Sequence, residues 1–158
     1  MNDDRSGLMG HRLEDRCAIT DQMYRYARAT DWLETDLHRD VFAAECVFAS
    51  PHSGDMHGVD AVVDWMDRVL TEFEATQHLI GNISITFTGE QTADAVSYVR
   101  AWHRYRDPER ADMVLWGEYH DHWICIDGVW RIVERRVLEA GIEPRREGGA
   151  KNPRRATR

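Results

Sequence analysis

Apolar positions recur at helical spacing in the first half of the chain. Intervals of three and four residues over 13–31 predict a long helix. Its face is predicted to consist of Leu13, Cys17, Thr20, Tyr24, Ala27 and Asp31, widened by Ile19, Met23 and Tyr26. A short second helix is predicted over 35–44. A clear apolar stripe predicts a third helix over 58–74.

The second half of the chain alternates apolar and polar positions, which is typical of β-strands. Alternation runs over 79–87 and 93–105, and a long apolar strand is predicted over 113–126. Asp127-Gly128 is a strong hairpin signal, after which another strand returns. This order predicts an α+β fold, in which about three N-terminal helices cover one face of a curved antiparallel sheet.

The length of 158 residues is typical of a single domain. We expect a flexible lead-in over 1–10, one folded domain over 11–140 and a basic, disordered tail over 141–158. The tail is predicted because residues 143–158 hold six arginine or lysine residues, two prolines and two glycines, with almost nothing apolar.

Composition excludes several functional classes. The net charge of −8 argues against general binding to nucleic acid or to anionic membranes. No apolar run approaches the roughly 20 residues that span a membrane, and the N-terminus lacks the apolar core of a signal peptide. The three cysteines lie far apart in apolar contexts, which indicates buried free thiols and a cytoplasmic location.

Asp31 is the first candidate functional residue, because a carboxylate continues the predicted apolar face of the first helix. An unpaired carboxylate there would cost several kcal/mol, so it needs a partner. Alternatively, the helix ends earlier and Asp31 caps the next one.

The strand over 93–105 has an unusual face. Its odd positions are almost all small until His103. Small side chains on a covered sheet face leave a void for a ligand, unless large residues from the helices fill it.

His78 raises a question of strand parity. The apolar positions that follow it, such as Ile83 and Ile85, are odd-numbered, whereas His78 is even. Either His78 points to the opposite face of the sheet, and that face lines the pocket, or a bulge near Gly81 resets the parity.

Metal and cofactor chemistry has weak support. His120 and His122 point to one side of a strand and could join His103 as metal ligands, but no convincing fourth ligand is present. P-loop, GxSxG and dinucleotide-binding motifs are absent from the sequence. We therefore expect no metal and no cofactor.

Five segments together resemble a known family over roughly residues 10–140. They are AITDQMYRYARATDW, DVFAAECVFAS, the helix 58–74, ATQHLIGN and EYHDHWICIDGVWRIVERR. Their order and spacing resemble the SnoaL-like branch of the nuclear-transport-factor-2-like superfamily. The resemblance implies a cone, in which a strongly curved antiparallel sheet and N-terminal helices enclose a pocket.

The resemblance also implies a site. Scytalone dehydratase, bile-acid 7α-dehydratase and hexachlorocyclohexane dehydrochlorinase are cofactor-free lyases of this branch, and each uses a His–Asp dyad. The matching positions here are His78, as the base that abstracts a carbon-bound proton, and Asp31, which orients it. Tyr26 and His103 match further site positions and would hydrogen-bond a carbonyl or a departing hydroxyl.

The chain departs from these relatives in two places. The region VFASPHSG holds Phe48 and Ser50 but not the tyrosine of the two dehydratases. Cys125 and Ile126 replace the cationic residue of the dehydrochlorinase. The substrate and the leaving group therefore cannot be carried over from any one relative.

The expected function is a cofactor-independent lyase of dehydratase type, or an isomerase, acting on a small hydrophobic cyclic molecule. The alternatives are a non-catalytic cone that binds a hydrophobic ligand, a polyketide-cyclase-like member, or an assembly role. We expect a homodimer or homotrimer formed through exposed sheet faces. The amphipathic face that favours such an assembly consists of Val96, Tyr98, Arg100, Trp102 and Arg104.

Overall fold

The computed structural model describes residues 5–144. Helices and strands follow one another along the chain with short connections. They are α1 (Arg5–Asp31), the 3₁₀ turn η1 (Thr35–Leu37), α2 (His38–Val41), β1 (Phe42–Ser50), β2 (Gly54–His57), α3 (Val59–Leu70), β3 (Phe73–Phe87), β4 (Thr92–Tyr105), β5 (Met113–Ile126) and β6 (Val129–Glu143).

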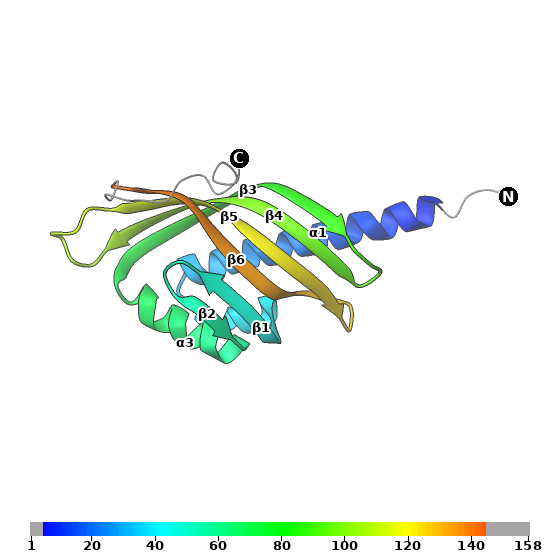
Figure 1. Ribbon diagram of the computed structural model, residues 1–158, viewed down its shortest axis with the longest axis horizontal. Coiled ribbons are helices and arrows are strands. Elements are labelled where there is room, and N and C mark those ends of the chain that lie inside the picture. Colours follow the sequence, from blue (N-terminus) through cyan, green and yellow to red (C-terminus); the bar gives the residue numbers. More distant parts are fainter. Residues whose placement is uncertain (1–4, 145–158) are drawn as a thin grey trace.

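The predicted α+β fold is confirmed. Six strands form one curved sheet in the order β2-β1-β6-β5-β4-β3, with α1 along its concave side and α3 beside β1 and β2 (Figure 1). The sheet is mixed and not purely antiparallel, because β1 pairs with β6 in parallel. This arrangement is the cone that the resemblance implied.

Strands β1 and β2 were missing from the sequence-based prediction, which placed a helix up to residue 44. The helical segment ends at Val41, and β1 begins at Phe42. The pairing of β1 with β6 shifts register between Phe42 and Val47, so buried positions in β1 do not alternate strictly. The irregularity hid the strand signal.

The predicted domain boundaries differ from the observed elements. Helix α1 begins at Arg5, so residues 5–10 of the predicted lead-in are helical. Strand β6 runs to Glu143, three residues past the predicted end of the domain at 140. Residues 1–4 and 145–158, which include most of the predicted tail, lie outside the described residues.

The third helix is shorter than predicted. Helix α3 ends at Leu70, and Phe73 belongs to β3. The buried ring of Phe73 extended the apparent apolar stripe past the end of the helix.

The buried face of α1 also differs from the predicted one. Leu13, Cys17 and Tyr24 are exposed, so the predicted stripe is wrong at these three positions, and so is the predicted burial of Cys17. The buried residues are the three that were expected only to widen the face, two alanines, of which Ala27 belonged to the predicted stripe, and two polar residues. They are Ile19, Gln22, Met23, Tyr26, Ala27, Ala29 and Thr30. Gln22 is buried without penalty because its amide donates to the Asp40 and Trp130 carbonyls.

The outer face of the sheet is partly apolar. Leu79, Tyr98 and Trp116 are exposed there, and the Arg100 guanidinium lies over the Trp116 ring. The expected association through this face stays a prediction. Within residues 5–144, no helix combines the length and the apolar character needed to cross a membrane.

A buried ion pair joins the two central strands of the core. Arg135 in β6 is fully buried and donates from Nε and Nη2 to the two carboxylate oxygens of Asp121 in β5, both at 2.7 Å. The guanidinium carbon lies 4.2 Å from the ring centroids of both Tyr26 and Tyr119. Paired hydrogen bonds and two aromatic faces together offset the cost of burying the charge.

We predict that Asp121→Ala lowers the free energy of unfolding by about 3–5 kcal/mol, because it leaves the buried Arg135 charge without a counterion. Urea denaturation measures the change. The control is Asp112→Ala, which removes the solvent-exposed partner of Arg104 and should have a much smaller effect. Equal losses in the two variants would contradict the prediction.

Candidate active site

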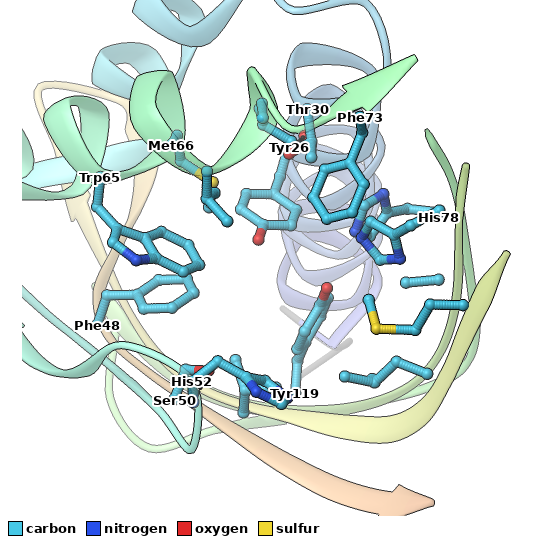
Figure 2. Close-up of a pocket in the computed structure, with 17 residues that line it drawn as sticks. Tyr26, Thr30, Phe48, Ser50, His52, Trp65, Met66, Phe73, His78 and Tyr119 are labelled. Atoms are coloured by element: carbon cyan, nitrogen blue, oxygen red, sulfur yellow. Dashed lines mark hydrogen bonds between the residues drawn. The ribbon is translucent and has the colours of Figure 1, made fainter. Parts of the chain in front are cut away.

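A pocket lies between the concave face of the sheet, α1 and α3, with a cavity of about 130 Å³ (Figure 2). Most of its lining is apolar or aromatic. The apolar residues are Phe48, Trp65, Met66, Val69, Leu70, Phe73, Ala101, Met113, Leu115 and Val137. The residues with polar groups are Tyr26, Thr30, Ser50, His52, His78, His103 and Tyr119.

His78 and Asp31 are in direct contact. The His78 Nδ1 lies 2.7 Å from Oδ1 of Asp31, and the side chains are only 7% and 16% exposed. The same carboxylate accepts the backbone N–H of His78 and the hydroxyl of Thr76, each at 2.9 Å. Asp31 is the last residue of α1 and does not cap the next helix, so that alternative is wrong.

A β-bulge explains how His78 reaches the pocket. His78 pairs with Ala101 and Ile85 pairs with Ala95, with a register shift between Gly81 and Ser84. The bulge therefore resets the parity, and His78 shares the concave face with Ile85. Asn82 within the bulge has a φ of 50°, a left-handed conformation that asparagine tolerates well.

The small side chains on one face of β4 were expected either to leave a void for a ligand or to be covered by larger residues. Each alternative holds over part of the strand. Ala93, Ala95 and Val99 belong to the hydrophobic core, so larger neighbours fill that end. Ala101 and His103 line the pocket, so the void lies at the other end.

The electrostatics of Asp31 follow from its contacts. Burial alone would raise its pKa, but the hydrogen bond and charge of His78, together with the Thr76 and backbone donors, lower the pKa below the ordinary carboxyl value. Asp31 is therefore a carboxylate at neutral pH. It accepts the Nδ1 proton of His78, which leaves Nε2 as the basic nitrogen.

His103 lies beside His78, with ring centroids 5.4 Å apart. Burial and the neighbouring His78 lower the pKa of His103 to about 4, so its ring is neutral at physiological pH. Its Nδ1 is buried without a hydrogen-bond partner among the described residues. A buried polar atom of this kind in a cavity is suited to a polar group of a ligand.

Tyr26 and Tyr119 place two hydroxyls in the pocket. Figure 2 shows these hydroxyls pointing toward each other, and they interact as hydrogen-bonding neighbours. Burial raises the pKa of both residues, although the Arg135 charge opposes the rise. Both tyrosines are therefore neutral hydrogen-bond donors. Tyr26 was predicted from the family resemblance, whereas nothing in the local pattern distinguished Tyr119.

Two histidines that the sequence analysis did not select also belong to this region. Buried His38 contacts the Thr35 carbonyl through Nδ1 at 2.8 Å and the Thr30 hydroxyl through Nε2 at 3.1 Å. His52, in the turn between β1 and β2, lines the pocket. Both lie in polar sequence contexts, so only their spatial neighbours reveal them.

The three histidines considered as metal ligands do not come together. His103 lines the pocket, whereas His120 pairs with Glu118 and His122 with Asp94, outside the pocket lining. Between residues 5 and 144, no cluster of three His, Cys, Asp or Glu side chains has the arrangement of a metal site.

Comparison with known families identifies the chain. A model of the SnoaL-like domain matches residues 11–136. The chain belongs to the SnoaL-like domain family. A curated relative, an uncharacterized protein of Mycobacterium tuberculosis, is 25% identical over 134 residues, which cover 84% of this chain and 90% of the relative.

Several solved structures share the fold. A protein from Novosphingobium aromaticivorans, provisionally named a scytalone dehydratase, is 27% identical, with 92% and 97% of the two chains covered and a TM-score of 0.82. A hexachlorocyclohexane dehydrochlorinase from Novosphingobium barchaimii is 15% identical, with 83% and 90% covered and a TM-score of 0.76. A nuclear-transport-factor-2-like superfamily protein from Salmonella enterica is 19% identical, with 77% and 87% covered and a TM-score of 0.69. The family match confirms the predicted SnoaL-like assignment, and the solved structures share the fold that the resemblance implied.

Buried His38 and partly buried His103 predict an acid-sensitive fold. Burial lowers the pKa of both His38 and His103 to about 4, so the folded state disfavours their charged forms. Their contribution to stability is complete above the unfolded-state pKa near 6.5 and is lost as the pH falls toward about 4. We expect a loss of at most about 3 kcal/mol per histidine.

Urea denaturation at pH values between about 7 and 5, above the main titration range of carboxylates, measures this effect. His103→Gln should flatten the pH dependence. The control variant His122→Gln, which removes an exposed histidine, should leave the dependence as in the wild type. An unchanged slope in His103→Gln would contradict the assignment of a neutral, buried ring.

Proposed function

We propose that this SnoaL-like protein is a cofactor-independent lyase of dehydratase type that acts on a small hydrophobic cyclic molecule. The observation that carries the proposal is the 2.7 Å contact between His78 Nδ1 and Asp31 Oδ1 at the wall of an apolar pocket. His78 is the general base, and its Nε2 removes a proton from a carbon next to an activating carbonyl. Asp31 holds the tautomer and stabilises the imidazolium that forms.

The pair is distinguished from other His–carboxylate pairs by its surroundings. His122 and Asp94 make the same Nδ1–Oδ1 contact at 2.6 Å, but their side chains are about half exposed and outside the pocket lining. His78 is nearly buried, and its carboxylate partner is held by two further donors. A dry, fixed base is better suited to proton abstraction than a solvated one.

Hydrogen-bond donors in the pocket support the same chemistry. Proton abstraction beside a carbonyl places negative charge on the carbonyl oxygen, which neutral donors in a water-poor site stabilise. Tyr26 and Tyr119 are such donors, and the Arg135 guanidinium packed on their rings adds positive charge nearby. His103 supplies a further ring nitrogen next to His78.

The cavity limits the size of the substrate. Its volume of about 130 Å³ is comparable to the roughly 150 Å³ apolar cavity that holds benzene in another protein. One six-membered ring therefore fills the enclosed part of the site. Two fold relatives are named for elimination reactions, a dehydratase and a dehydrochlorinase, which favours elimination over isomerisation.

The test uses cyclic β-hydroxyketones with one ring as probes. We expect wild-type protein to accelerate formation of the conjugated enone, followed by ultraviolet absorbance, and exchange of the α-proton in D₂O, followed by NMR. His78→Ala should lower both rates by about 100-fold or more, because general bases contribute that much. Asp31→Asn should lower kcat more than it changes KM.

The matched control is His122→Ala, which removes the exposed member of a similar His–Asp pair and should keep the wild-type rate. Full activity in a folded His78→Ala variant would overturn the role of the base. Tight binding of the probes by the wild type, with neither reaction accelerated, would support the alternative function of a ligand-binding cone.

A further inference from the structure

A second His–carboxylate pair borders the same cavity. His52 lies in the turn between β1 and β2, and its Nε2 is 2.9 Å from Oε2 of Glu139 in β6. The Glu139 side chain is only 11% exposed, whereas His52 is 44% exposed. The backbone N–H of His52 donates to the Ser50 hydroxyl, so the turn itself helps to fix the residue.

His52 and His78 reach the cavity from different walls. Figure 2 shows His78 on the side of β3 and His52 near Tyr119, on the side of the β1–β2 turn. Each of them lies close enough to His103 for its charge to lower the pKa of that residue. One ring-sized ligand in the cavity can therefore face a histidine on each side.

Loss of water needs a proton donor as well as a base. Hydroxide is a poor leaving group, so the departing oxygen must be protonated as its bond to carbon breaks. His78 cannot supply this proton while it accepts one from carbon. When the carbon–hydrogen and carbon–oxygen bonds break together, a second group in the pocket has to carry it.

The other polar groups in the lining are less suited to this task. His103 is neutral at physiological pH, because its pKa is about 4. Burial raises the pKa values of Tyr26 and Tyr119, which makes them hydrogen-bond donors and weak acids. His52 differs from all three, because its ring contacts a largely buried carboxylate and is partly open to solvent, which can return a proton after each turnover.

We propose that His52, held by Glu139, is the general acid that protonates the leaving hydroxyl of the substrate. This role rests on the proposed lyase function. Nε2 of His78 takes the α-proton, and the electron pair of that C–H bond forms the new carbon–carbon double bond. The β-carbon–oxygen bond breaks, and its electron pair stays on the oxygen, which accepts a proton from His52 and departs as water. Glu139 engages Nε2, so Nδ1 of His52 is the nitrogen that donates.

The test compares two leaving groups on one cyclic ketone, a β-hydroxyl and a β-chloro substituent. Chloride departs without a proton, so its elimination needs the base but not the acid. We expect His52→Gln to lower elimination of water by about 100-fold or more and to keep elimination of HCl near the wild-type rate. His78→Ala should lower both reactions. Glu139→Gln, which keeps a hydrogen-bond acceptor but removes the charge, should reduce elimination of water selectively and to a smaller extent.

A matched control comes from the pair of His120 and Glu118, in which Nε2 and Oε2 lie 2.8 Å apart outside the pocket lining. His120→Gln should leave both reactions at the wild-type rate. Circular dichroism verifies that each variant is folded.

Two results would overturn the acid role while leaving the base in place. The first is a His52→Gln variant that eliminates water at the wild-type rate. The second is an equal fall in the rates of both eliminations in that variant, which would indicate a structural effect. A wild-type protein that accelerates neither elimination nor α-proton exchange would instead overturn the proposed function, and the role of His52 with it.

Discussion

The carboxylate of Asp31 is the contact on which the rest of the site depends. It accepts the ring N–H and the backbone N–H of His78 together with the hydroxyl of Thr76, so the last residue of α1 is tied to the middle of β3. The same three bonds set the distance between helix and sheet, keep Asp31 ionised and fix the tautomer of His78. One side chain therefore positions an element of the fold and orients the ring of the proposed base.

Among the described residues, three histidines line this apolar pocket, and their surroundings differ. His78 has a buried carboxylate partner, His103 is kept neutral by burial and by its neighbour, and His52 shares a carboxylate at a partly exposed turn. Identical side chains thereby have different partners and different access to solvent, and the proposed acid–base chemistry uses that difference. The proposed division of roles between base and acid follows from these surroundings.

The buried charge of Arg135 lies against the two tyrosines of the pocket. Arg135 pairs with Asp121 and lies against the rings of Tyr26 and Tyr119, so a cation that β6 contributes to the core also acts on two hydroxyls in the pocket. The same group therefore contributes to the stability of the core and, in the proposed function, to the charge near the two hydroxyls. A change at Asp121 should therefore affect the fold before it affects any bound ligand.

The sequence by itself determined the fold class, the four long strands and the segments of the three helices, because apolar periodicity reports the buried face of a regular element. It did not predict β1, because a register shift breaks the alternation of that strand. It also predicted the wrong face of α1, because the exposed Leu13 and Tyr24 lie at the spacing of a buried apolar stripe. The family resemblance predicted that Asp31 and His78 form a pair, and the structure shows them in contact. Residue periodicity alone did not decide whether Asp31 caps the next helix or which face of the sheet His78 occupies.

Only the tertiary structure decided which side chains share the cavity. The bulge near Gly81 turns His78 inward, and long-range pairing places Glu139 beside His52 and Arg135 beside Tyr26. The partners are far apart in the chain. His52 lies in a turn, Tyr26 in α1, and Glu139 and Arg135 in β6, and these elements come together only in the folded, curved sheet. A local pattern records which face of its own element a residue occupies, but it carries no record of what packs against that face.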